Sequence, residues 1–104
     1  MRKILYRPRA QTDLDSIFVY IAVDLGSPGA AKKLRKKLSE AIERIADVPT
    51  VGKAFVDEEL GQAYRRILVE NYWVYYTFDS KKIVIWRIVH ASRDVDHYGF
   101  HVFE

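Results

Sequence analysis

The chain has 104 residues, a net charge of +3 and 49% hydrophobic residues, which predicts one domain, residues 1–104, with a core of modest stability. It has no cysteine, and this excludes disulfides, thiolate metal sites and cysteine nucleophiles. No apolar run approaches the ~20 residues that span a membrane, and the apolar core near the first residue is too short for a signal peptide. We therefore expect a cytoplasmic protein.

Basic residues are concentrated early in the chain. Residues 1–37 hold nine Lys and Arg against three acidic residues, whereas residues 38–63 hold two against six. A basic region of this kind suggests an acidic partner or nucleic acid, although a solvated helix face gives the same pattern.

The first elements are a strand and a helix. Lys3–Tyr6 is a short apolar run that ends before Pro8, and we expect a strand that joins a later sheet. From Ala10 to Leu25 apolar residues recur at helical spacing, and Gly26 is placed as the stop of this helix.

A second helix follows at once. Ser27 is placed as its N-cap, Pro28 as its first residue and Pro49 as its end, so the two helices should form an antiparallel hairpin. Residues 49–63 contain three Gly or Pro breakers and an acidic patch, and they predict a loop.

Three strands are expected next. The first begins at Arg65, and Glu70-Asn71 turns the chain, with Asn71 suited to a positive φ. Tyr72–Phe78 is bulky on both faces, which predicts a central strand. A turn at residues 79–81 leads to a strand over Ile83–Val89.

The order β-α-α-β-β-β predicts an α+β two-layer domain in which the helix hairpin covers one face of a three-stranded antiparallel meander. We expect one set of residues in the last strand to face the helices: Val84, Trp86 and Ile88. The alternate set would line the open face: Ile83, Ile85, Arg87 and Val89. A bulge near His90 would invert part of this assignment.

Polar residues that could perform chemistry gather in and after the last three strands. They are Arg65, Arg66, Arg87, His90, Arg93, Asp94 and Tyr98. Guanidinium groups bind phosphate oxygens, and a histidine or tyrosine could move a proton from a ribose hydroxyl. The alternative for each is structural, as an ion pair or a satisfied strand-end residue. His90, His97 and His101 fit no standard metal spacing, and we expect no metal and no cofactor.

The run YRRILVENYWVYY, an acidic turn, and IVIWRIVHASRD together resemble the RelE/ParE superfamily of type II toxin–antitoxin toxins, also called plasmid stabilisation proteins. Asp13-Leu14 in the first helix, and Pro49 with Gly52, agree with this resemblance. It implies a small cytoplasmic toxin that a cognate antitoxin neutralises. RelE-like members cleave mRNA on the ribosome without a metal, and ParE-like members inhibit DNA gyrase.

The nuclease pattern of RelE is incomplete in this chain. Arg65 and Tyr98 match it, Trp73 stands where RelE has an arginine, and Ser92 stands where it has another, with Arg93 beside it. The ending from Arg87 to Asp94 is closer to ParE-like members.

Three functions therefore remain open: a ParE-like toxin that binds gyrase, a ribosome-dependent endoribonuclease, and a domain that binds its antitoxin without toxicity. In the second case the catalytic residues would be Arg65, Arg87, His90, Arg93 and Tyr98. The antitoxin would bind the basic helix face and the exposed apolar positions of the first helix, and either a homodimer or a heterotetramer with the antitoxin is expected. The residues expected on that face are Lys32, Lys33, Lys36 and Lys37.

Overall fold

The computed structural model describes residues 1–57 and 61–92. Its nine elements run in the order β1 (Lys3–Tyr6), α1 (Pro8–Val19), a π-helical turn η1 (Tyr20–Asp24), α2 (Pro28–Asp47), a 3₁₀ turn η2 (Pro49–Val51), β2 (Lys53–Asp57), β3 (Gln62–Val69), β4 (Tyr72–Phe78) and β5 (Lys82–His90). The strands form one sheet in the order β1-β5-β4-β3-β2. β1 pairs in parallel with β5, and the other neighbouring strands that the structure describes pair antiparallel.

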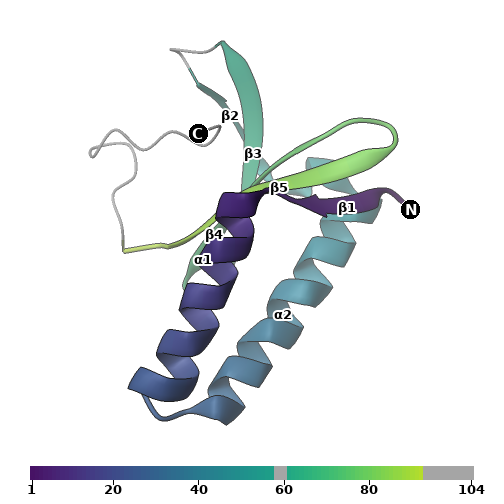
Figure 1. Ribbon diagram of the computed structural model, residues 1–104. Coiled ribbons are helices and arrows are strands. Elements are labelled where there is room, and N and C mark those ends of the chain that lie inside the picture. The colour runs from purple at the N-terminus through teal and green to yellow at the C-terminus, as the bar shows by residue number, and fades with distance from the viewer. Residues whose placement is uncertain (58–60, 93–104) are drawn as a thin grey trace.

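The helices form an antiparallel hairpin on one face of the sheet, as Figure 1 shows. The main core lies between the two layers: Leu38, Ile42 and Ile45 of α2 pack in one cluster with Val74 and Tyr76 of β4 and the isoleucines of β5. Each of these side chains is at most 2% exposed. The α+β two-layer arrangement predicted from the sequence is therefore confirmed. No helix in the described ranges is long and apolar enough to cross a membrane.

The helix boundaries follow local chemistry. Pro8 stands at the first position of α1, where its missing N–H costs nothing, so this helix begins two residues earlier than expected. Gly26, with a φ of +62°, ends the first helical segment, and Pro28 opens α2. Ser27 is the N-cap residue as expected, but its hydroxyl donates to the carbonyl of Leu25 instead of accepting a helix N–H.

The facing of β5 differs from the prediction in its first half. Ile83 and Ile85 lie in the helix-side core, whereas Trp86 packs on the other face. The cause is an irregularity in the β4–β5 ladder: Tyr75 lies opposite Arg87 and Tyr76 lies opposite Ile85, so Trp86 has no partner in the register. One extra residue reverses the alternation, and beyond it Ile88 faces the helices as predicted.

Two further expectations were wrong. The segment expected to be a loop contains β2, which pairs antiparallel with β3 along all five of its residues. In the β3–β4 turn the positive φ belongs to Glu70, at +53°, and not to Asn71. The Lys37 ammonium lies 2.5 Å from the Glu70 carboxylate and ties this turn to α2.

Candidate functional site

Arg87 is buried in an ion pair. Its Nε and Nη2 donate to the two carboxylate oxygens of Asp13 at 2.8 and 3.2 Å. The same carboxylate accepts the backbone N–H of Ile88 at 2.9 Å. Residue 88 lies beyond the part of β5 that β1 covers, because their register ends where Tyr6 lies beside Ile85. Asp13 thus satisfies an edge donor of the sheet and a buried guanidinium together.

Sequence reasoning did not assign this role to Asp13. A signal was present, since Asp13 lies between Ala10, Leu14 and Ile17 on the apolar stripe of α1. A carboxylate that is buried in such a stripe requires a partner, because Asp is almost never buried unpaired.

Arg65 also serves the fold. Its Nη1 donates to the carbonyl oxygens of Gly52, at 2.7 Å, and Thr50, at 3.3 Å. The Tyr76 hydroxyl binds the same turn, since it donates to the Pro49 carbonyl and accepts the Gly52 N–H. Together these two side chains hold the connection between α2 and β2.

Arg66 points to the opposite face, where it lies among aromatic rings. Its guanidinium carbon is 4.0 Å from the centroid of Trp73 and 4.4 Å from that of Phe55. Its Nη1 donates to the Tyr75 hydroxyl at 3.3 Å, and its Nε is buried without a hydrogen-bond partner among the described residues. Cation–π contacts of this kind stabilise the Arg66 guanidinium at a site that is partly shielded from water.

His90 ends β5 on an exposed surface. Its Nδ1 accepts the backbone N–H of Ser92 at 3.1 Å and lies 2.7 Å from the Ser92 hydroxyl oxygen. The ring stands edge-on to Tyr72, with 5.2 Å between the centroids. Burial raises the pKa of Tyr72, and the neighbouring Tyr20 raises it further, so this hydroxyl remains protonated at neutral pH.

The structure does not bring the predicted catalytic residues together. Arg65 lies opposite Tyr76 of β4, and His90 lies opposite Tyr72. Four residues of strand separate these positions, which is about 13 Å. Arg87 is held by Asp13. Arg93, Asp94 and Tyr98 lie outside the described residues.

A groove does lie beside His90. It has a volume of about 560 Å³ and runs between the end of the helix hairpin and the β3–β4 turn. Its lining is mostly apolar, with Lys33 and Lys37 on the α2 side and Glu70, the ion-pair partner of Lys37, in the turn. The lining includes Tyr20, Ile21, Leu25, Lys33, Leu34, Lys37, Tyr72 and His90. A second hollow of about 380 Å³ shares Tyr20, Tyr72 and His90 with the groove and continues it toward Asp13. Tyr20 and Ile21 belong to η1, and π-helical turns are frequent at functional sites.

Comparison with known proteins agrees with this architecture. The family model described as the ParE toxin of the type II toxin–antitoxin system parDE matches residues 4–95. The chain belongs to the ParE toxin family. A solved structure, "Chromosomal ParDE TA system from P. aeruginosa", matches with a TM-score of 0.67 and 25% sequence identity, covering 86% of this chain and 96% of that chain. A search of curated proteins gave no match. The protein is thus a ParE-like toxin of a type II toxin–antitoxin module.

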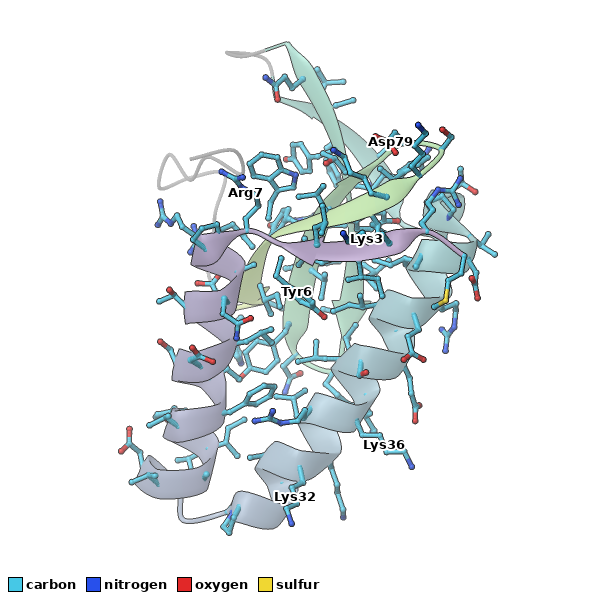
Figure 2. The ribbon with its side chains drawn as sticks, turned by 45° about the vertical axis from the view of Figure 1, so that its right-hand side comes forward. Lys3, Tyr6, Arg7, Lys32, Lys36 and Asp79 are labelled. Carbon is cyan, nitrogen blue, oxygen red and sulfur yellow. The ribbon has the colours of Figure 1, made fainter. Side chains whose placement is uncertain are left out.

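In this ParE-family toxin the four predicted antitoxin-binding lysines divide into two pairs. Lys33 and Lys37 line the groove. Lys32 and Lys36 do not line the groove and lie on the solvent-exposed side of α2, as Figure 2 shows, and Lys36 lies 3.9 Å from Glu40. The helix hairpin thus carries two basic faces, of which one borders an apolar groove.

The toxin shows no group of three or more His, Asp or Glu residues that could hold a metal ion within residues 1–57 and 61–92. His97 and His101 lie outside these ranges.

Proposed function

We propose that this ParE-family toxin acts by binding and inhibiting DNA gyrase, and that an antitoxin neutralises it by occupying the groove between the helix hairpin and the β3–β4 turn. The observation that favours binding over catalysis is the engagement of the candidate arginines. Arg87 forms a buried ion pair with Asp13, and Arg65 donates hydrogen bonds to two backbone carbonyls. Guanidinium groups held in this way are not available to a scissile phosphate.

The target is tested by inducing the toxin without its antitoxin and following thymidine and methionine incorporation in parallel. For a gyrase inhibitor, DNA synthesis falls first, and the purified toxin inhibits supercoiling by purified gyrase. If protein synthesis collapses first, the target is the ribosome and the proposal fails.

His90→Ala separates the two mechanisms further. A nuclease that uses His90 as acid or base would lose most of its activity, because proton transfer contributes about 10²–10⁴-fold. The toxin as a gyrase binder should keep its inhibition, since this exposed side chain bonds only to Ser92 among the described residues. An unchanged unfolding temperature shows that the variant folds.

The groove beside His90 has the shape and charge of a binding site for an antitoxin segment. Antitoxins of such modules end in a segment, often acidic, that folds on its toxin, and an amphipathic helix in an apolar groove is a common mode of such binding. The groove offers exposed apolar side chains, with Tyr20 at 51% and Leu25 at 56%, beside the ammonium group of Lys33. Lys37 also lines the groove and is paired with the Glu70 carboxylate. An acidic amphipathic segment matches this lining.

The helix supplies a matched control. Lys33→Glu should weaken antitoxin binding about tenfold at low salt, and less at high salt. Lys32→Glu makes the same charge change outside the groove and should have a smaller effect. Equal losses from the two variants would mean that the antitoxin responds to net charge and does not occupy the groove.

A further inference from the structure

The β3–β4 turn holds a glutamate in a backbone conformation that favours glycine. Glu70 is the first residue of the two-residue loop between β3 and β4, and its φ is +53°. Tight hairpins with a positive φ at this position usually have glycine or asparagine there. Just before β3 the chain does use a glycine, since Gly61 has a φ of +65°. Among the non-glycine residues of the described ranges, Glu70 alone has a positive φ.

The stability of the fold does not explain a glutamate at this position. A left-handed conformation raises the free energy of a residue that has a Cβ atom, and glycine avoids this cost. Glu70 does pair with Lys37 of α2 at 2.5 Å, but the two side chains are 48% and 57% exposed. An ion pair this exposed contributes less than the backbone conformation costs. Since backbone strain is concentrated at functional sites, the role of Glu70 should lie in its surroundings.

Those surroundings are the groove beside His90, which Glu70 and Lys37 both line. Lys33 lies one helical turn before Lys37 and lines the groove too. Within residues 1–57 and 61–92, Lys33 pairs with no carboxylate. The groove of the free toxin therefore offers one ammonium group to a partner, while a carboxylate of the toxin itself neutralises the second. An acidic segment that binds here must compete with Glu70 for Lys37 and approach a like charge.

We infer that Glu70 is a specificity-determining residue of the groove, because its carboxylate occupies the place on Lys37 that a carboxylate of the partner would take. This inference rests on the proposed function, in which an acidic antitoxin segment lies in the groove. A segment binds tightly only when its other contacts offset the displacement of Glu70, so poorly matched acidic segments are rejected. Glu70 thus lowers the affinity of the groove and raises its selectivity.

The test compares Glu70→Gln with Glu40→Gln by surface plasmon resonance, with the purified cognate antitoxin as the probe. Glu40 lies outside the groove, 3.9 Å from Lys36, so its variant removes the same charge from another exposed lysine–glutamate pair. Glu70→Gln should lower the dissociation constant about two- to fivefold at low salt, the range expected for one exposed charge pair. The gain should shrink at high salt, and Glu40→Gln should leave the dissociation constant unchanged.

Two binding results would overturn the inference. One is a dissociation constant that Glu70→Gln leaves unchanged or raises. The other is an equal gain from Glu40→Gln, which would mean that the antitoxin responds to net charge. Glu70→Gly tests the fold separately, since glycine suits the positive φ. It should unfold at the wild-type temperature or above, and a fall of more than about 4 °C would assign Glu70 to the stability of the turn and overturn the inference.

Lys33→Glu, measured in the same series, separates this inference from the proposed function. If Lys33→Glu weakens binding while Glu70→Gln has no effect, the groove holds the antitoxin and only the role of Glu70 is wrong. If neither variant changes the dissociation constant, the antitoxin binds elsewhere and the proposed use of the groove fails as well.

Discussion

The two edges of the sheet differ in how far other parts of the protein cover them. At the β1 edge the parallel strand is short, and beyond it the Asp13 carboxylate of α1 takes the Ile88 N–H. The remaining length of β5 therefore packs against a helix and its edge donor is satisfied. At the β2 edge no carboxylate or helix covers the strand among the described residues, and Val56 is exposed.

This difference shows that one side chain can satisfy the backbone donor of an edge strand that has no neighbouring strand. A single carboxylate supplies the acceptor that a neighbouring strand would supply, and it neutralises Arg87 at the same time. Among the described residues, the β2 edge is anchored from its inner side, through β3 and the turn that precedes β2. Substitutions at the β1 edge should therefore lower the free energy of unfolding strongly. Substitutions at the β2 edge should lower it little, except at the turn that anchors β2.

The largest loss in the free energy of unfolding is expected from Asp13→Ala. It removes the carboxylate from a guanidinium that is 6% exposed and from the Ile88 N–H, and breaking a buried pair in this way costs about 3 kcal/mol or more. Urea denaturation measures the loss. Asp15→Ala on the same helix removes only an exposed hydrogen bond to Gln11 and is the control. A loss no larger than that of the control would mean that the β1 edge does not depend on Asp13.

Tyr76→Phe tests the anchor of the other edge. The hydroxyl donates to the Pro49 carbonyl at 2.6 Å and accepts the Gly52 N–H at 2.9 Å, so its removal leaves both buried groups unsatisfied. The expected loss is about 2 kcal/mol. Thermal unfolding checks it, with Tyr20→Phe as the exposed control. A loss that matches the control would show that β2 is held by its pairing with β3 alone.

Asp79, near the β1 edge, should make a smaller contribution to the free energy of unfolding, and this contribution depends on pH. The backbone N–H of Lys81 and then that of Lys82 lower the pKa of this carboxyl below 3.8. A lowered pKa in the folded protein means that the stabilisation is present above pH 3.8 and is lost as the pH falls through the folded value. The difference in unfolding free energy between wild type and Asp79→Ala should be constant near neutral pH and narrow under acid conditions. A difference that stays constant down to pH 2 or widens on acidification would contradict this assignment.

The smallest effect is expected from Val56→Thr, which keeps the side-chain shape at the open edge. Because Val56 is 63% exposed, the free energy of unfolding of the monomer should change by less than about 0.5 kcal/mol. Urea denaturation checks this. A larger loss would mean that this edge is covered within the monomer, and the contrast between the two edges would disappear.

The architecture was predictable from the sequence because its signals are local. Helical spacing of apolar residues, Pro28 and Pro49 place α2 nearly to the residue. A first strand that joins the sheet was also predicted from the short apolar run, but its parallel pairing with β5 was not. The β2 strand was missed because its five residues lie between breakers and beside an acidic patch. The facing of β5 was missed because an apolar run with no alternation carries no information on a bulge at Trp86.

The candidate site was less predictable for a physical reason. The roles of Arg65 and Arg87 depend on partners far away in the sequence, namely the Gly52 carbonyl and the Asp13 carboxylate. Spacing within the strands shows where an arginine lies but not what neutralises it. The groove beside His90 likewise needs η1, α2 and the β3–β4 turn at once, and no single segment indicates it. The resemblance supplied the family, which the structure and the comparisons confirmed.

The parallel pairing of β1 has a consequence for the order of folding. Lys3 lies beside Lys82, so the first strand to be synthesised has no partner until the last described strand has left the ribosome. The meander from β2 to β5 contains only hairpin connections and can form before it, because contacts at small sequence separation close at a lower entropic cost. During synthesis the Asp13–Arg87 pair therefore also forms late, and the nascent toxin acquires its closed edge as one of its final steps.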